Sequence, residues 1–250
     1  MKEAVIVSTA RTPIGKAFRG AFNDTQAQEM AGHAIAEAVK RSKVSKEEID
    51  DVIVGAAGQQ GSQQGNIARQ SLLRAGLPVS VAGMSLDRQC ASGMMAIATA
   101  AKEITEDGMT ITVGGGVESV SLVRNENFRM DRARDPWLEE NIPALYMTMI
   151  ETAENVAKRY GISREAQDEY SLQSQMRTAK AQQNGYMDKE IVPLKSTMKY
   201  KDKETGEISS HDVCIEKDEG NRPSTTLEGL SALKPLSLIH ISEPTRPTPI

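Results

Sequence analysis

The chain has 250 residues, of which 26% are charged, and its formal net charge at pH 7 is -4. This length suits one large domain or two ordinary ones with a sizeable core. Acidic and basic residues are mixed throughout, so bulk charge gives no reason to expect nucleic acid as a partner. The apolar run at the N-terminus is too short for a secretory leader, and no window approaches the length of a membrane span. We therefore expect a cytoplasmic protein with no membrane contact.

The patterning of the first 120 residues predicts strands that alternate with helices. The predicted elements are a buried strand at 4–10, a helix at 27–39, a strand at 52–55, a helix at 66–75, a short apolar strand from Met84, a helix at 92–106 and a strand at 109–113. Such alternation indicates a largely parallel α/β sheet. Helix 92–106 is apolar nearly all round, which predicts burial between two layers.

After residue 120 the pattern changes. Residues 121–146 show little periodicity and predict an excursion from the sheet. Next come a helix ended by Gly161, a long helix capped by Ser163, and a hairpin at 198–215 that turns around 204–206. From Leu236 onward no structural pattern continues, and we expect a flexible or foreign tail at 236–250.

Cys90 is the candidate for covalent chemistry. The stretch Met84–Glu103 predicts a strand, a tight turn and a helix, with Cys90 at the turn. The positive end of a helix favours a thiolate there, and reactive groups gather at the carboxyl ends of parallel strands. The residues alone leave open a second interpretation, in which Cys90 is a small buried hydrophobe. Cys214 lies inside a predicted hairpin strand, which favours a structural role. The spacing of the two cysteines predicts no disulfide, and no Cys/His cluster offers a metal site.

Seven stretches in the same order carry a family likeness over residues 1–235. They are VIVSTARTPIGKAFRGAF at 5–22, GNIARQ at 65–70, RQCASGMMAI at 88–97, GGGVESVS at 114–121, TAENVAKRYGISREAQDEYSLQSQ at 152–175, EIVP at 190–193 and RPSTTLEGLSALKP at 222–235. With these stretches the chain resembles the thiolases, the acetyl-CoA acyltransferases and acetyltransferases of fatty acid and ketone metabolism. The resemblance favours Cys90 as the nucleophile.

The resemblance also implies an architecture. Thiolases have a layered α/β fold of two similar halves that share buried central helices. This chain corresponds to the first half plus a loop domain, without the second half. The implied domains are an α/β domain at 1–120 with the nucleophile, a coenzyme A-binding loop domain at 121–235, and a tail at 236–250 outside the family.

The implied reaction is ping-pong acyl transfer. Cys90 would attack the 3-keto carbon of a 3-ketoacyl-CoA, release acetyl-CoA and pass the acyl group to a second CoA, and the reverse Claisen condensation is also possible. CoA and acyl-CoA are substrates, and no cofactor or metal is implied. Arg222 matches a position that contacts the nucleotide end of CoA, and Met149 matches a position that lines the pantetheine and acyl pocket. A homo-oligomer, dimer or tetramer, is implied for the full-length parent.

Two alternatives stand beside this interpretation. One is a ketosynthase-type condensing enzyme, which uses the same cysteine chemistry on carrier-protein substrates. The other is a non-catalytic fragment that binds CoA or pairs with a thiolase subunit. The sequence lacks the family's two histidines and its glycine-rich cysteine motif. We therefore expect the chain as written to have little or no thiolase activity.

Overall fold

The computed structural model describes residues 2–235, so the predicted tail lies outside the described residues. The chain divides into two compact units. The first combines the described residues up to Phe128 with Met187–Gly220, and the second combines Arg129–Tyr186 with the described residues from Asn221 on. The domain boundaries at residues 120 and 235 stay predictions.

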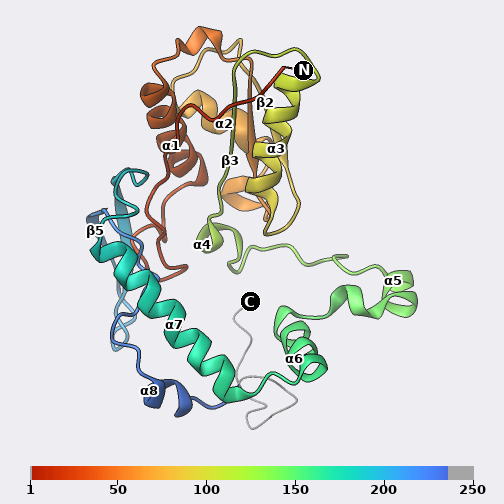
Figure 1. Ribbon diagram of the computed structural model, residues 1–250, viewed down its shortest axis with the longest axis vertical. Helices are drawn as coiled ribbons and strands as arrows, with labels where there is room; N and C mark the ends of the chain where they lie inside the picture. Colours follow the sequence, from red (N-terminus) through yellow and green to blue (C-terminus); the bar gives the residue numbers. More distant parts are fainter. Residues whose placement is uncertain (1, 236–250) are drawn as a thin grey trace. The chain divides into compact units, whose positions relative to one another are not determined.

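A three-stranded parallel sheet lies at the centre of the first unit (Figure 1). The strands are β1 (Asp51–Gly55), β2 (Ala82–Leu86) and β3 (Thr112–Gly116), in the order β2-β1-β3. In this register Ile53 lies between Met84 and Gly114. The expected mixed α/β fold with a parallel sheet is confirmed. The third strand starts three residues later than predicted and includes the whole glycine triplet.

Helices cover both faces of this sheet. They are α1 (Ala27–Ser42), α2 (Ile67–Arg74) and α3 (Ser92–Thr105), with 3-10 turns η1 (Lys46–Glu48) and η2 (Gly61–Gln63) in the connections. Because side chains alternate along a strand, Val52 and Val54 pack with α1 and α2, while Ile53 packs against α3. The result is three layers, with the sheet in the middle.

The prediction of a buried first strand at 4–10 is wrong. Residues 4–10 are extended but make no backbone–backbone hydrogen bond to another described residue. Val5, Ile6 and Val7 are 71%, 77% and 68% exposed. The segment forms one wall of a cavity of about 850 Å³, which residues of α1, α3 and β3 also line. The strand propensity of β-branched residues depends on their context. Among the described residues, no neighbouring strand pairs with the backbone of residues 4–10.

Helix α3 is buried on one face only, which corrects the expectation of burial all round. Ser92, Ala96, Ala100 and Glu103 are buried. Met94 on the other face is 78% exposed, because no described element of the first unit covers it.

The predicted hairpin is confirmed and belongs to the first unit. Strands β4 (Leu194–Lys201) and β5 (Ile208–Ile215) pair in antiparallel fashion. The Asp202 carboxylate accepts hydrogen bonds from the N–H groups of Glu204 and Thr205, which closes the turn. Leu194 packs against Phe22 and Met30 and so attaches the hairpin to the start of the chain.

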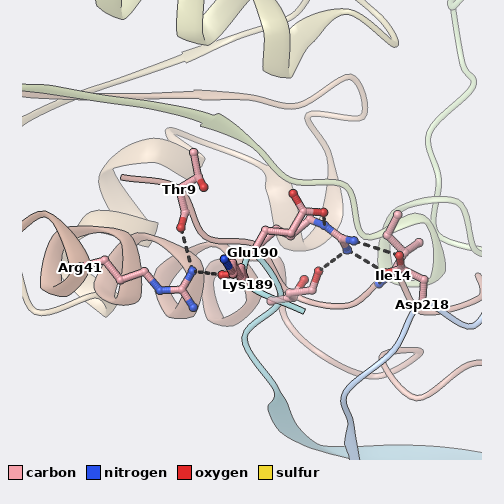
Figure 2. A network of polar contacts seen from close by, with 8 residues as sticks. Thr9, Ile14, Arg41, Lys189, Glu190 and Asp218 are labelled. Carbon is pink, nitrogen blue, oxygen red and sulfur yellow. Dashed lines mark hydrogen bonds and ion pairs between the residues drawn. The ribbon is translucent and has the colours of Figure 1, made fainter. Parts of the chain in front are cut away.

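A polar network joins residues 9–14 to the segments that flank the hairpin (Figure 2). Arg11 donates two hydrogen bonds to Asp218, at 2.7 and 3.0 Å, and one to Glu190 at 2.8 Å. Arg41 donates to the carbonyls of Thr9 and Lys189. These contacts hold the end of the segment, although residues 4–10 make no backbone–backbone hydrogen bond to another described residue.

The second unit is mainly helical. Its elements are α5 (Pro136–Asn141), η3 (Pro143–Tyr146), α6 (Met149–Tyr160), α7 (Arg164–Gln183) and α8 (Leu227–Ser231), while α4 (Val120–Val123) belongs to the first unit. Gly161 ends α6 with a φ of 64°, and Ser163 caps α7 by accepting the N–H of Ala166, both as predicted. Within residues 2–235, no helix combines the length and the apolarity needed to cross a membrane.

Candidate active site

Cys90 lies in a tight turn between the end of β2 and the start of α3. The turn is closed by backbone hydrogen bonds from Ala91 to the Arg88 carbonyl and from Ser92 to the Gln89 carbonyl. Gln89 adopts a φ of 50°, in the left-handed region that non-glycine residues rarely occupy. The thiol of Cys90 is free and exposed. This exposure removes the interpretation of Cys90 as a buried hydrophobe.

The backbone N–H of Cys90, like its thiol, is free within the part of the chain that the structure describes. It donates to no backbone carbonyl of residues 2–235. An N–H that is not used by the fold can donate to an oxygen that becomes negative during acyl transfer. Thiol and donor therefore belong to the same residue at the same turn.

A second polar group orders the loop at this edge of the sheet, and the sequence pattern did not single it out. The Glu118 carboxylate accepts hydrogen bonds from the N–H groups of Ala57 and Gly58 and from the Gln63 side chain, the last at 2.7 Å. Gln63 is fully buried and accepts the N–H of Ser119. The loops that follow β1 and β3 are thus joined. The only signal in the sequence was the place of Glu118 two residues after the glycine triplet.

Cys214, the other cysteine, has a different setting. It lies in β5 opposite Lys195, and its thiol is also free and exposed. It precedes no helix. Exposure alone therefore does not distinguish the two thiols, and the turn at Cys90 does.

Arg222 lies in the second unit. Its backbone N–H donates to the Gln175 side chain of α7 at 2.7 Å, and its carbonyl accepts from Thr225. Asn221 also donates to Gln175. The backbone is thereby fixed, while the side chain is exposed and forms no ion pair with a described residue. Such an arginine is available to an anionic ligand.

Met149 is the first residue of α6 and is 79% exposed. The preceding Thr148 caps the helix: its hydroxyl accepts the N–H of Glu151, and the Glu151 carboxylate accepts the N–H of Thr148. Met149 and Arg222 thus lie on different elements of the second unit, whereas Cys90 lies in the first. Among the described residues, no group of three or more His, Cys, Asp or Glu side chains could hold a metal ion.

Comparison with known proteins identifies the class. The family model described as "Thiolase, N-terminal domain" matches residues 4–237, which is most of the chain. The chain belongs to the thiolase family.

Several relatives carry thiolase names. A "3-ketoacyl-CoA thiolase" of Bacillus subtilis is 39% identical over 237 residues, which cover 94% of this chain and 59% of that protein. A "Beta-ketoadipyl-CoA thiolase" of Acinetobacter baylyi is 38% identical, and a "3-oxoadipyl-CoA/3-oxo-5,6-dehydrosuberyl-CoA thiolase" of Escherichia coli is 39% identical, each with 94% of this chain and 60% of the relative covered. The chain thus spans about three fifths of the length of these relatives.

Proposed function

We propose that this chain carries the nucleophile of a thiolase and forms an acyl-cysteine at Cys90 from an acyl-CoA. The single observation that supports this most is the exposed thiol in the tight turn directly before α3. The substrate class is 3-ketoacyl-CoA, in keeping with the names of the relatives. The setting is fatty acid β-oxidation in the cytoplasm, and the parent protein is a homo-oligomer.

The proposed chemistry has two half-reactions. In the first, the Cys90 sulfur attacks the 3-keto carbon, the bond between C2 and C3 breaks, and the departing carbon takes a proton to leave as acetyl-CoA. In the second, the sulfur of free CoA attacks the acyl-cysteine carbonyl, and the Cys90 thiolate leaves. The Cys90 N–H donates to the oxyanion, which typically contributes about 2.7–4 kcal/mol to the transition state.

The first test is a search for the acyl adduct. The purified chain is incubated with acetyl-CoA, and peptides are examined by mass spectrometry for acetyl at Cys90. The proposal expects the adduct in the wild type and in Cys214→Ser, and no adduct in Cys90→Ala. Acetyl on both cysteines at similar levels would indicate non-specific chemistry and contradict the proposal.

Arg222 and Met149 are proposed to contact the substrate. The Arg222 guanidinium would pair with the phosphates of CoA, and the thioether of Met149 would contact the pantetheine or acyl chain. We expect Arg222→Ala to weaken CoA binding by about tenfold, which corresponds to about 1.4 kcal/mol. Arg159→Ala, which removes an exposed arginine of α6, is the matched control and should leave the affinity unchanged. Equal affinities in the two variants would refute the role of Arg222.

Complete turnover is a separate question. Since the sequence lacks the family's two histidine motifs and its glycine-rich cysteine motif, we expect little CoA-dependent cleavage of acetoacetyl-CoA by these 250 residues. Turnover in the ordinary range of about 1–1000 per second would contradict this expectation.

A further inference from the structure

The side chain of Ser92 holds the turn that contains Cys90. Ser92 is the first residue of α3 and is 4% exposed. Its hydroxyl donates to the Gln89 carbonyl at 2.6 Å and accepts the N–H of Arg88 at 2.8 Å. One buried oxygen therefore makes two hydrogen bonds across the turn, both to residues that precede Cys90.

The position of Ser92 is in turn set by the sheet. A Cβ atom built on Gly55, the last residue of β1, would lie 2.2 Å from the carbonyl carbon and oxygen of Ser92. A Cβ atom on Gly116, the last residue of β3, would lie 2.9 Å from Cα of Gly93. The start of α3 thus rests directly on the backbone of two strands, and no side chain can come between them.

The left-handed backbone at Gln89 makes this support necessary. A non-glycine residue persists in that conformation only where its surroundings hold it. The hydrogen bond from Ser92 Oγ acts on the carbonyl of Gln89 itself, and a further one joins the Gln89 N–H to the Asp87 carboxylate at 2.7 Å. Without the hydroxyl, the Arg88 N–H and one acceptor site of the Gln89 carbonyl would lose their partner.

We propose that Ser92 is a positioning residue for Cys90, and that Gly55 and Gly116 position Ser92. The role rests on the proposed function of Cys90 as nucleophile. Ser92 touches no reacting atom; it fixes the direction in which the thiol and the N–H of Cys90 point relative to the start of α3. Removal of the hydroxyl lets the turn relax, and the thiol then behaves like an ordinary exposed cysteine.

The experiment is alkylation of the full chain with iodoacetamide, followed by mass spectrometry of the two cysteine peptides. Cys214 is exposed in a strand and serves as the internal reference. For Ser92→Ala we expect the alkylation rate of Cys90, relative to that of Cys214, to fall by about tenfold, and its pH profile to approach that of Cys214. Thr99→Ala is the matched control. It removes another hydroxyl of α3, which donates to the Met95 carbonyl oxygen at 2.9 Å, and it leaves the turn at Cys90 intact.

A second pair of variants separates positioning from the hydroxyl itself. Gly55→Ala keeps the hydroxyl but displaces Ser92, so it should reproduce the loss at Cys90. Gly115→Ala is its control, because a Cβ atom there meets nothing within 4 Å. Hydrogen exchange at the β1 amides reports whether each variant remains folded, and if Ser92→Ala does not, the glycine pair decides.

An unchanged pH profile and rate of Cys90 in folded Ser92→Ala would overturn the proposal, as would equal profiles in Gly55→Ala and Gly115→Ala. Alkylation requires no acyl-CoA. If wild-type Cys90 forms no acyl adduct, the proposed function fails while this comparison still gives an answer on Ser92.

Discussion

Two apolar runs of similar composition have opposite fates in this structure. β1 contains Val52, Ile53 and Val54, all of which are 2% exposed or less, and it pairs with strands on both sides. The N-terminal run contains Val5, Ile6 and Val7, which are largely exposed and unpaired among the described residues. The comparison teaches that β-branched residues give a segment a propensity for strand structure, whereas the strands and helices beside the segment decide whether a strand forms.

The largest expected effect is a pair of truncations in the two runs. Ile53→Ala removes a fully buried side chain that packs on α3, so we expect a loss of about 2–5 kcal/mol in the free energy of unfolding. Ile6→Ala should change it by less than about 0.5 kcal/mol, because Ile6 is exposed. Urea unfolding of both variants measures the difference. A large loss for Ile6→Ala would mean that the N-terminal run is packed in solution.

The second prediction concerns the anchor at the end of the N-terminal run. Asp218→Asn removes the charge that pairs with Arg11. We expect the free energy of unfolding to fall by about 1–3 kcal/mol, which urea unfolding measures. Asp188→Asn, at an exposed position, is the matched control.

This loss should depend on pH. Burial acts to raise the pKa of Asp218, but hydrogen bonds from Arg11 and from the Ile14 N–H outweigh it and hold the pKa below its usual value. A carboxyl group with a lowered pKa stabilises the fold at neutral pH, and that contribution disappears as the pH falls through its folded pKa. The difference between wild type and Asp218→Asn should therefore shrink in acid. A constant difference would argue against the ion pair as its cause.

The third prediction tests the helix that covers β1 and β3. A Cβ atom on Gly114 would lie 2.8 Å from Cα of Ile97, so Gly114→Ala should cost about 1–3 kcal/mol by pushing α3 away. Gly115→Ala, one residue further, should have little effect. Thermal unfolding of the two variants provides the test, and equal midpoints would show that α3 adjusts freely.

The smallest expected effect is a gain in stability, at Glu103. Burial, with the nearby charges of Asp51 and Asp107, raises the pKa of Glu103, and its Oε2 atom has no hydrogen-bond partner among the described residues. A group with a raised pKa contributes its full stability at low pH and loses it as the pH rises through its folded pKa. Glu103→Gln should therefore be more stable than wild type at neutral pH, by on the order of 1 kcal/mol, and this advantage should vanish in acid. Glu106→Gln, at an exposed site, should show no such trend.

Much of the fold could be predicted because local signals agree with the tertiary structure. The Ser163 cap and the Gly161 stop both form as the sequence indicates. The exposed face of α3 and the unpaired residues 4–10 could not be predicted, because both depend on which elements lie beside them. An apolar pattern indicates that a surface can be buried but does not say what buries it.

In the candidate site, too, local features could be predicted from the sequence, whereas contacts between different elements could not. The place of Cys90 at a turn before a helix could be inferred from the change of pattern after Leu86. The support from Ser92 and Gly55 could not, because it joins residues from different elements at distances that no spacing in the sequence encodes. The roles of Arg222 and Met149 stay predictions.

The ion pair of Arg11 with Asp218 joins residues that are 207 positions apart in the chain. The entropy lost on closing a loop rises with the logarithm of its length, so contacts this remote are favoured once the intervening segments have ordered. The sheet of β1, β2 and β3 can assemble from neighbouring segments long before that. We therefore expect residues 9–14 to join the fold after this sheet has formed, and to be released before the sheet opens.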